Sequence, residues 1–237
     1  MAEGRLDKRL SDAAQISRRE AREIIKTGRV RIDGLVCKQP DTKVAGESEI
    51  SLDGSVLVCE ENVYIMLNKP AGVVTAVSDA AEKTVLDLIP PKAFRRELFP
   101  VGRLDKDATG LLILTDDGDF AHKVTHPSGG IKKLYEIHAA EEFSQEDVAA
   151  FAAGITLRDG TRCLPARLEI DSDDSRRAFV EISEGKYHQV KRMAASRGNS
   201  VISLRRLAIG RLHLDKKLRE GEFRRLGREE IERVFML

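Results

Sequence analysis

A polar loop with two carboxylates is the part of the sequence best suited to chemistry. It covers residues 102–110 and holds Asp105 and Asp107 close to Arg103. An apolar segment, residues 111–114, follows the loop and is predicted to be a strand. Polar side chains on a loop held by strands stay accessible while their backbone is rigid. An ionised carboxylate there can attack an electrophilic carbon or stabilise positive charge on it.

Two other residue types could work with such a carboxylate. Tyr135 offers a flat apolar ring with one polar end. Lys191, in the tract EGKYHQVKRM, offers a cation. A cation close to a carboxylate favours its charged form. The alternatives are a core tyrosine and an ordinary surface lysine.

Hydrophobic periodicity predicts the elements that position these groups. Residues 63–67 have the pattern of a buried strand, and residues 68–72 form a turn after it. A helix is expected over residues 119–125, because Pro127 cannot continue it.

The first 50 residues predict two helices and a hairpin. Apolar residues at helical spacing indicate the first helix. Ser17 lies three residues before Glu20, a capping box that begins a second helix over residues 18–27. Asp33 and Gly34 then form a strong hairpin signal.

A row of cations follows one face of the second helix and continues into the hairpin. Residues four apart are neighbours on a helix, so these cations could follow an RNA phosphate backbone. The alternative is a solvated face whose cations pair with Glu20 and Glu23. The predicted RNA contacts of this module are Arg18, Arg22, Lys26, Arg29 and Arg31.

Two parts of the chain resemble known families. Residues 4–50 resemble an S4 RNA-binding domain. GRLDKDATGLLILTDDG, residues 102–118, closely resembles the signature of the pseudouridine synthases, above all those that act on ribosomal RNA and carry an S4 domain. Three further stretches agree with this family, in its order: residues 132–135, 184–193 and 198–206, the last resembling its last core strand.

The resemblance implies roles for four residues. Asp105 is expected to act at C1′ of a uridine, either by addition or on a route through a glycal. Lys191 takes the place of the family's basic partner, where related groups carry arginine. Tyr135 is expected to stack on the uracil and remove the C5 proton, and Leu204 to keep water from the base.

Surrounding residues are expected to bind RNA or brace the site. A flipped nucleotide must leave its stack, which costs a few kcal/mol. Arg103 is expected to hold a phosphate or to fill the place that the flipped base leaves. Asp107 and Thr109 are expected to brace the loop by hydrogen bonds. His188 is expected to support the active-site strand. Phosphate contacts that could offset the flipping cost come from Lys132, Lys133, Arg192, Arg205 and Arg206.

The expected fold is α+β with two domains. Residues 1–58 form the small S4-like RNA-binding domain. Residues 61–237 form the catalytic domain, a mixed, largely antiparallel sheet with helices on its faces and a basic cleft across it. The boundary is expected near Glu60-Glu61.

Composition excludes several classes of protein. The 237 residues carry a net charge of +1, and 41% are hydrophobic, without an apolar run of membrane-spanning length or a secretory signal. Cys37, Cys59 and Cys163 form no CxxC pair. His122 and His126 have metal-ligand spacing but no evident third ligand, so no metal is expected. No dinucleotide or phosphate-loop motif is present, so no cofactor is expected either. A cytoplasmic monomer fits best.

The target is less sharply indicated than the reaction. The tract over residues 184–193 looks most like that of the small-subunit enzymes, so 16S ribosomal RNA, free or in a partly assembled subunit, is the expected partner. The alternatives are a 23S ribosomal RNA pseudouridine synthase, a non-catalytic RNA-binding assembly factor, and a carboxylate enzyme acting on free nucleosides.

Overall fold

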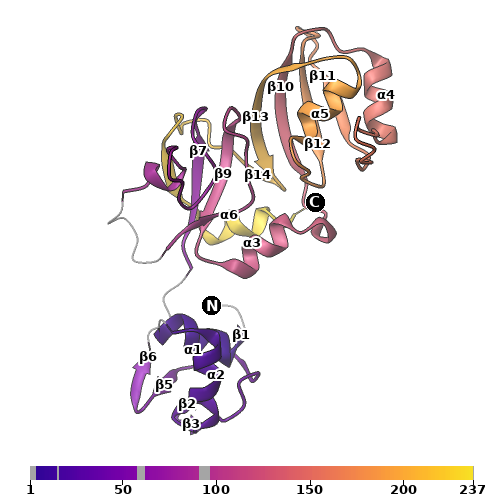
Figure 1. Ribbon diagram of the computed structural model, residues 1–237. Helices are drawn as coiled ribbons and strands as arrows, with labels where there is room; N and C mark the ends of the chain where they lie inside the picture. The colour runs from indigo at the N-terminus through magenta and orange to yellow at the C-terminus, as the bar shows by residue number, and fades with distance from the viewer. Residues whose placement is uncertain (1–3, 15, 58–61, 91–96, 237) are drawn as a thin grey trace. The chain divides into compact units, whose positions relative to one another are not determined.

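The chain folds into two compact units, Met1–Glu61 and Asn62–Leu237. The computed structural model describes residues 4–14, 16–57, 62–90 and 97–236 (Figure 1). The predicted boundary at Glu60-Glu61, like Cys59, lies outside the described residues. Each unit has its own hydrophobic core, so each can be considered by itself.

The first unit packs two helices against a small sheet. Ser17 caps the second helix as predicted, since its hydroxyl accepts a hydrogen bond from the amide of Glu20 at 3.2 Å. Leu10 and Ile25 are among the side chains that fill the core. In the described part of this unit, four strands pair antiparallel in the order β3-β2-β5-β6, and β1 pairs with β4. The elements are β1 (Gly4–Arg5), α1 (Leu6–Ala14), α2 (Arg18–Lys26), β2 (Val30–Ile32), β3 (Leu35–Val36), β4 (Lys43–Val44), β5 (Ile50–Leu52) and β6 (Ser55–Leu57).

The second unit is built on one mixed sheet. Among its described residues, nine strands join in the order β11-β12-β10-β13-β9-β7-β15, with β14 beside β13 and β8 beside β9. The predicted α+β class and largely antiparallel sheet are therefore confirmed. The strands are β7 (Tyr64–Lys69), β8 (Phe99–Pro100), β9 (Thr109–Thr115), β10 (Lys133–Ala139), β11 (Arg167–Ile170), β12 (Arg177–Ile182), β13 (Val201–Ile209), β14 (Leu212–His213) and β15 (Phe223–Arg225).

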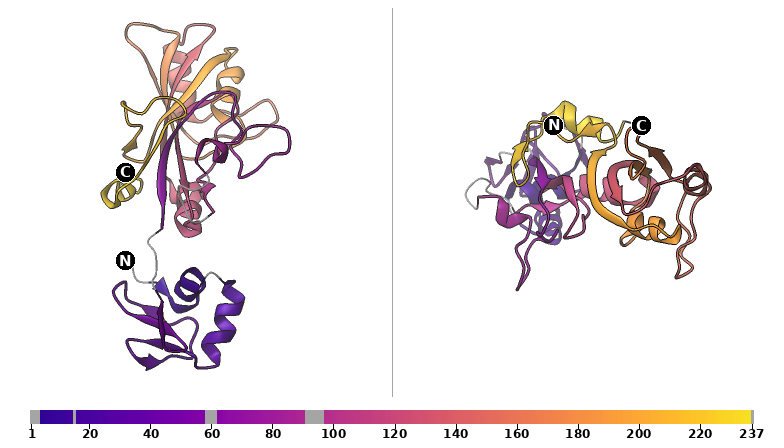
Figure 2. Two further views of the ribbon diagram at one scale, coloured as in Figure 1. Left: turned by 90° about the vertical axis from the view of Figure 1, so that its left-hand side faces the viewer. Right: turned by 90° about the horizontal axis from the view of Figure 1, so that it is seen from above.

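Helices cover this sheet in two groups (Figures 1 and 2). Phe151 of α4 and Met193 of α5 pack in one core with β10 and β12. Phe120 of α3 packs in a second core with β7 and β9. The helices are α3 (Gly118–Thr125), α4 (Gln145–Ala153), α5 (Gln189–Ser196) and α6 (Arg228–Arg233), with 3-10 turns at Leu86–Leu88 and Pro127–Gly129.

The two halves of the sheet meet at a seam between β9 and β13. These strands pair in parallel, through Arg205 with Thr109 and Arg206 with Gly110. Gly110 has a φ of 101°, and a Cβ built on it would lie 2.3 Å from the carbonyl oxygen of Arg206. Only glycine tolerates both conditions, so this residue permits the close approach of the two strands.

The sheet continues beyond β13, the strand that the resemblance indicated as the last of the core. Two short strands follow it, β14 and β15, and β15 pairs with β7 at the sheet edge through Phe223 and Leu67. Two of the three residues of β15 are arginines, so the sequence shows no apolar alternation there. β15 belongs to the sheet because it pairs with the apolar strand β7, and its own sequence pattern does not indicate a strand.

Candidate active site

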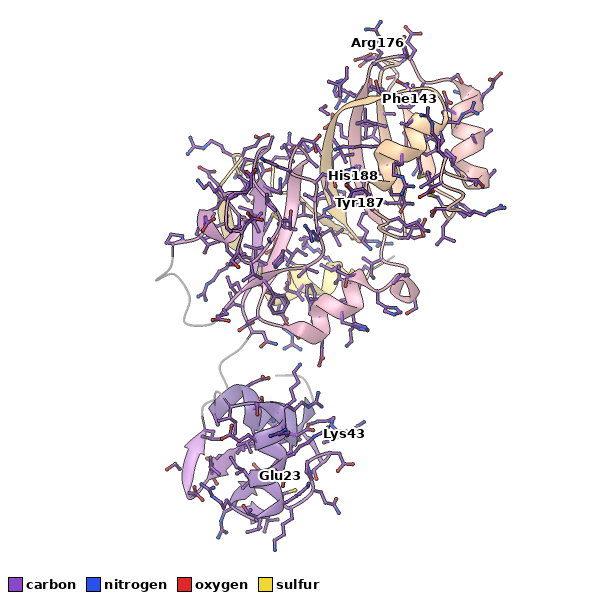
Figure 3. The ribbon with its side chains drawn as sticks, in the orientation of Figure 1. Glu23, Lys43, Phe143, Arg176, Tyr187 and His188 are labelled. Atoms are coloured by element: carbon purple, nitrogen blue, oxygen red, sulfur yellow. The ribbon has the colours of Figure 1, made fainter. Side chains whose placement is uncertain are left out.

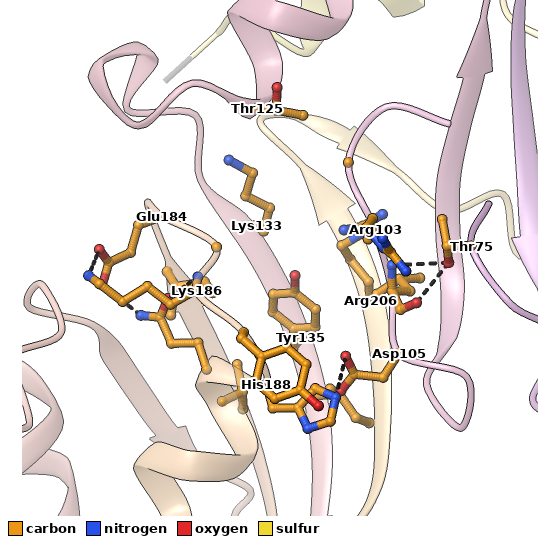
Figure 4. Close-up of a pocket in the computed structure, with 18 of the residues that line it drawn as sticks. Thr75, Arg103, Asp105, Thr125, Lys133, Tyr135, Glu184, Lys186, His188 and Arg206 are labelled. Carbon is orange, nitrogen blue, oxygen red and sulfur yellow. Dashed lines mark hydrogen bonds and ion pairs between the residues drawn. The ribbon is translucent and has the colours of Figure 1, made fainter. Parts of the chain in front are cut away.

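A cavity of about 640 Å³ lies at the seam and is lined from both halves of the sheet (Figure 4). The loop before β9 contributes Asp105 to its wall, β10 contributes Tyr135, and β13 contributes Leu204. The three residues expected to meet the uridine are therefore brought together from distant parts of the sequence.

Lys191 binds two carboxylates at this cavity. Its Nζ lies 3.0 Å from Oδ2 of Asp105 and 2.6 Å from Oδ1 of Asp107. Asp105 and Lys191 are each only 22% exposed. Burial opposes the charge of Lys191, but the hydrogen bonds to Asp107 and Asp105 outweigh it and raise the pKa above its ordinary value. Lys191 is therefore a permanent cation at neutral pH.

Two neighbours of the pair make contacts that the sequence did not specify. Asp107 accepts a hydrogen bond from Lys191, and this bond lowers the pKa of Asp107. Thr109 begins β9 and pairs with Arg205 across the seam.

His188 is not the expected support of a strand. It lies just before α5 with a φ of 48°, and its Nε2 is 3.4 Å from Oδ1 of Asp105. Its ring stacks on Tyr187, with the centroids 3.9 Å apart (Figure 3). Tyr187 is 75% exposed and also lines the cavity, a position suited to stacking on a base. Tyr187 is the aromatic residue in the tract EGKYHQVKRM, and this feature of the sequence could have indicated its role.

The carboxylate loop is held from beneath by a lysine that sequence reasoning missed. Lys69, at the end of β7, is 0% exposed. Its Nζ donates to the carbonyl oxygens of Pro70 at 3.0 Å, Lys106 at 3.2 Å and Ala108 at 2.8 Å. Burial lowers the pKa of Lys69 to about 8. A lysine that ends an apolar strand was the only hint of this role.

Tyr135 and Leu204 both pack in the hydrophobic core and also form part of the cavity wall. Tyr135 lies opposite Arg206 across the pair β10–β13, and Leu204 lies opposite Ile137. Their accessible edges therefore face the cavity while the rest of each side chain is packed.

The predicted RNA-binding cations of the second unit divide into two groups. Arg103, Lys133 and Arg206 line the cavity, whereas Arg192 and Arg205 do not. Arg192 instead pairs with Asp159, and Lys132 pairs with Glu181. Arg206 is only 4% exposed, because alternation along β13 turns it inward with Leu204, and its phosphate contact stays a prediction.

The cations of α2 have a partner that the sequence pattern did not indicate. Arg18 and Arg22 reach back to Asp7 of α1, at 3.2 and 2.8 Å, and Arg5 also contacts it. The Asp7 side chain is fully buried, while Arg18 and Arg22 remain 48% exposed. Burial opposes ionisation of Asp7, but the three arginines outweigh it and hold its pKa well below the usual range.

The remaining cations of this module are paired and exposed. Lys26 contacts Glu23 at 2.9 Å, as the solvated-face alternative expected. Arg29 pairs with Asp53, and Arg31 donates to the carbonyl oxygen of Gly34.

Two kinds of feature are absent from the described residues. They include no helix long and apolar enough to cross a membrane. They also include no group of three or more His, Cys, Asp or Glu side chains placed to hold a metal ion.

Comparison with known proteins identifies the family. The family model described as RNA pseudouridylate synthase matches residues 63–196, and the S4 domain model matches residues 4–50. An "uncharacterized RNA pseudouridine synthase YtzG" of Bacillus subtilis (strain 168) is 41% identical over 96% of each chain. A "ribosomal small subunit pseudouridine synthase A" of Vibrio cholerae is 40% identical over 98% of this chain and 99% of its own. The chain belongs to the RNA pseudouridylate synthase family.

A solved structure agrees with this assignment. A crystal structure of a pseudouridylate synthase matches 97% of this chain and 99% of its own, with a TM-score of 0.70 and 39% identity. The protein is therefore an isomerase that converts uridine in RNA to pseudouridine, with an S4 domain ahead of its catalytic domain.

Proposed function

We propose that the protein modifies a uridine of 16S ribosomal RNA with Asp105 as the nucleophile. The observation that supports this role is the contact of Asp105 with Lys191 in a cavity whose wall also holds Tyr135. Similarity over nearly the full length to a relative named for the ribosomal small subunit supports the choice of RNA.

The reaction needs a carboxylate that is ionised and fixed in place. The C1′–N1 bond breaks, and Asp105 acts at the sugar by adding to C1′ or on the glycal route. On the glycal route C2′ loses a proton and regains one when C5 bonds to C1′. The uracil turns, C5 bonds to C1′, the C5 proton leaves and N1 gains a proton. Lys191 places a positive charge beside Asp105, and Tyr135 stacks on the base and accepts the C5 proton.

The cavity must also exclude water, which would capture the sugar and leave a hydrolysed RNA. Leu204 and Tyr135 form an apolar wall for this purpose. Arg103, which is exposed at the cavity, holds a phosphate of the flipped nucleotide or fills the space that its base leaves. Cofactor and metal have no part in this scheme.

The test is a pseudouridine map of 16S and 23S ribosomal RNA from cells that lack the protein, carry it, or carry Asp105→Asn. We expect one 16S position to lose its pseudouridine without the protein and to remain unmodified with Asp105→Asn. The variant keeps the shape and removes the nucleophile, so its RNA affinity should be within about twofold of wild type. A change confined to a position in 23S RNA would reject the 16S target, and modification by Asp105→Asn would reject the nucleophile.

A further inference from the structure

Arg206 is a buried cation whose hydrogen bonds are incomplete. Its Nε donates to the carbonyl oxygen of Leu111 at 2.7 Å. Its Nη2 is buried and has no hydrogen-bond partner among the residues that the structure describes. A buried donor without a partner is costly unless a ligand satisfies it, and here the side chain lines a cavity.

Lys133 is a second cation in the same wall. Its Nζ donates only to the carbonyl oxygen of Val124, at 3.2 Å, among the contacts within the described residues. Burial, together with the charge of Arg206, lowers the pKa of Lys133 to about 8. Two buried or partly buried cations thus share one wall, and the charge of Arg206 disfavours the charged form of Lys133.

Their counter-charge is missing from the described part of the chain. Lys191 has two carboxylates, and Lys69 has three carbonyl oxygens. Among described residues, no carboxylate lies within ion-pair distance of Lys133 or Arg206. A negative charge that enters this end of the cavity would therefore be stabilised strongly, because little water screens it.

The sheet places both cations beside the residue proposed to hold the base. Lys133 and Tyr135 are two apart on β10, so their side chains leave the same face. Arg206 lies directly across from Tyr135 on β13. Figure 4 draws the three side chains along the cavity wall.

Negative charge arises on the base during the reaction. When the C1′–N1 bond breaks, its electron pair goes to the uracil, which becomes an anion delocalised over N1, O2 and O4. The pair is used again when C5 bonds to C1′, and the C5 proton then leaves as N1 is protonated. Between these steps the anion must turn within the cavity.

We propose that Arg206 and Lys133 form an anion subsite that stabilises the uracil as it leaves C1′ and turns. The inference rests on the proposed stacking of the base on Tyr135. Fixed donors aimed at charge that develops in the transition state accelerate the reaction without reorganisation. A phosphate is the poorer occupant, since a flipped nucleotide enters base first and Arg206 is almost fully buried.

The test compares two leaving groups. A ribosomal RNA fragment carries, at the mapped position, either uridine or 5-fluorouridine, whose base is more acidic and leaves more readily as an anion. Disappearance of the starting nucleoside is followed in single turnover for wild type, Arg206→Gln, Lys133→Met and Arg206→Lys. Arg211→Gln, which removes an exposed cation just after β13, is the matched control.

With uridine we expect Arg206→Gln to be slower by about 10²–10³-fold, the effect typical of removing one oxyanion donor. With 5-fluorouridine its defect should shrink by about tenfold or more, because a better leaving group needs less stabilisation. Lys133→Met should show the same pattern, Arg206→Lys should recover part of the rate, and Arg211→Gln should match wild type. RNA affinity should not change.

Two results would overturn the subsite. Equal defects with both bases would indicate a structural role, and weaker RNA binding with an unchanged rate at saturation would indicate a phosphate contact. If Arg206→Gln does not fold, Lys133→Met decides alone. Failure of the proposed function is separate: wild type would then convert neither fragment.

Discussion

At the scale of single residues, the site depends on one ammonium group shared by two carboxylates. Asp107 is largely exposed, so its pairing with Lys191 is worth little in water. Asp105 is mostly buried, so water screens its 3.0 Å contact with the same amine less. Lys191 thus orients Asp105 and places a positive charge beside it.

Replacement of Lys191 tests this electrostatic role. Lys191→Met keeps the length and removes the cation, and we expect the single-turnover rate to fall by about 10–100-fold, as for the removal of one charged hydrogen bond of about 1.5–3 kcal/mol. Lys191→Arg restores a cation and should recover much of the rate. RNA affinity is the control. If Lys191→Arg is as slow as Lys191→Met while both variants bind RNA, the amine has a geometric or proton-transfer role instead.

The sequence indicated Asp105 and Lys191 but not the residue that supports the loop, Lys69. The motif around Asp105 and the tract around Lys191 indicated both residues by resemblance. Lys69 could not be found in this way, because nothing in an apolar strand shows that its terminal lysine turns inward to three carbonyl oxygens. Burial of a charge depends on partners far along the chain, which periodicity does not reveal.

At the scale of elements, the helix pair α1–α2 is joined by charge as well as by apolar packing. Periodicity and the Ser17 cap predicted α2 closely. They did not predict that Asp7 would bind Arg18 and Arg22, because these partners meet only when the helices pack. The local pattern determines which face of a helix is polar, whereas tertiary contacts determine what that face binds.

Asp7 should give the first unit a distinctive response to acid. Its pKa is depressed in the fold, so its contribution is present above the unfolded value of about 3.9 and disappears as pH falls through the folded pKa. Asp7→Asn should cost about 3 kcal/mol near pH 7, the lower end for a buried pair because the arginines are half exposed. Relative to wild type, it should also lose stability less steeply below pH 4.

Urea titrations at pH 7 and pH 3, followed by the amide NMR signals of α1 and α2, would measure both effects. Asp53→Asn is the matched control, since it removes an exposed partner of Arg29 and should cost under about 1 kcal/mol. An equal destabilisation of both variants at pH 7 would show that burial does not increase the contribution of Asp7 to the free energy of unfolding.

At the scale of the whole molecule, the S4 domain and the catalytic domain form separate compact units. The cores of the catalytic unit lie wholly within Asn62–Leu237, so deletion of residues 1–58 should leave it folded. The deletion should weaken RNA binding and reduce the slope of log affinity against log salt by about one for each phosphate that the first unit binds. Titrations of the target RNA at several salt concentrations measure this, with thermal unfolding as the control. An unchanged affinity and slope would mean that the first unit is not an RNA anchor.

The seam between β9 and β13 has a consequence for how activity is acquired during folding. Asp105 precedes β9, whereas Tyr135, Lys191 and Leu204 belong to the other half of the sheet. The seam joins residues nearly 100 positions apart, and such distant pairings form late because long loops must close first. The cores also cross the seam, since Leu104 and Ala108 pack with β10 and β12, and Ile209 packs with β7 and β9. Neither half contains a complete site. On refolding, catalytic activity should therefore return after most of the secondary structure, when Gly110 comes to rest against Arg206.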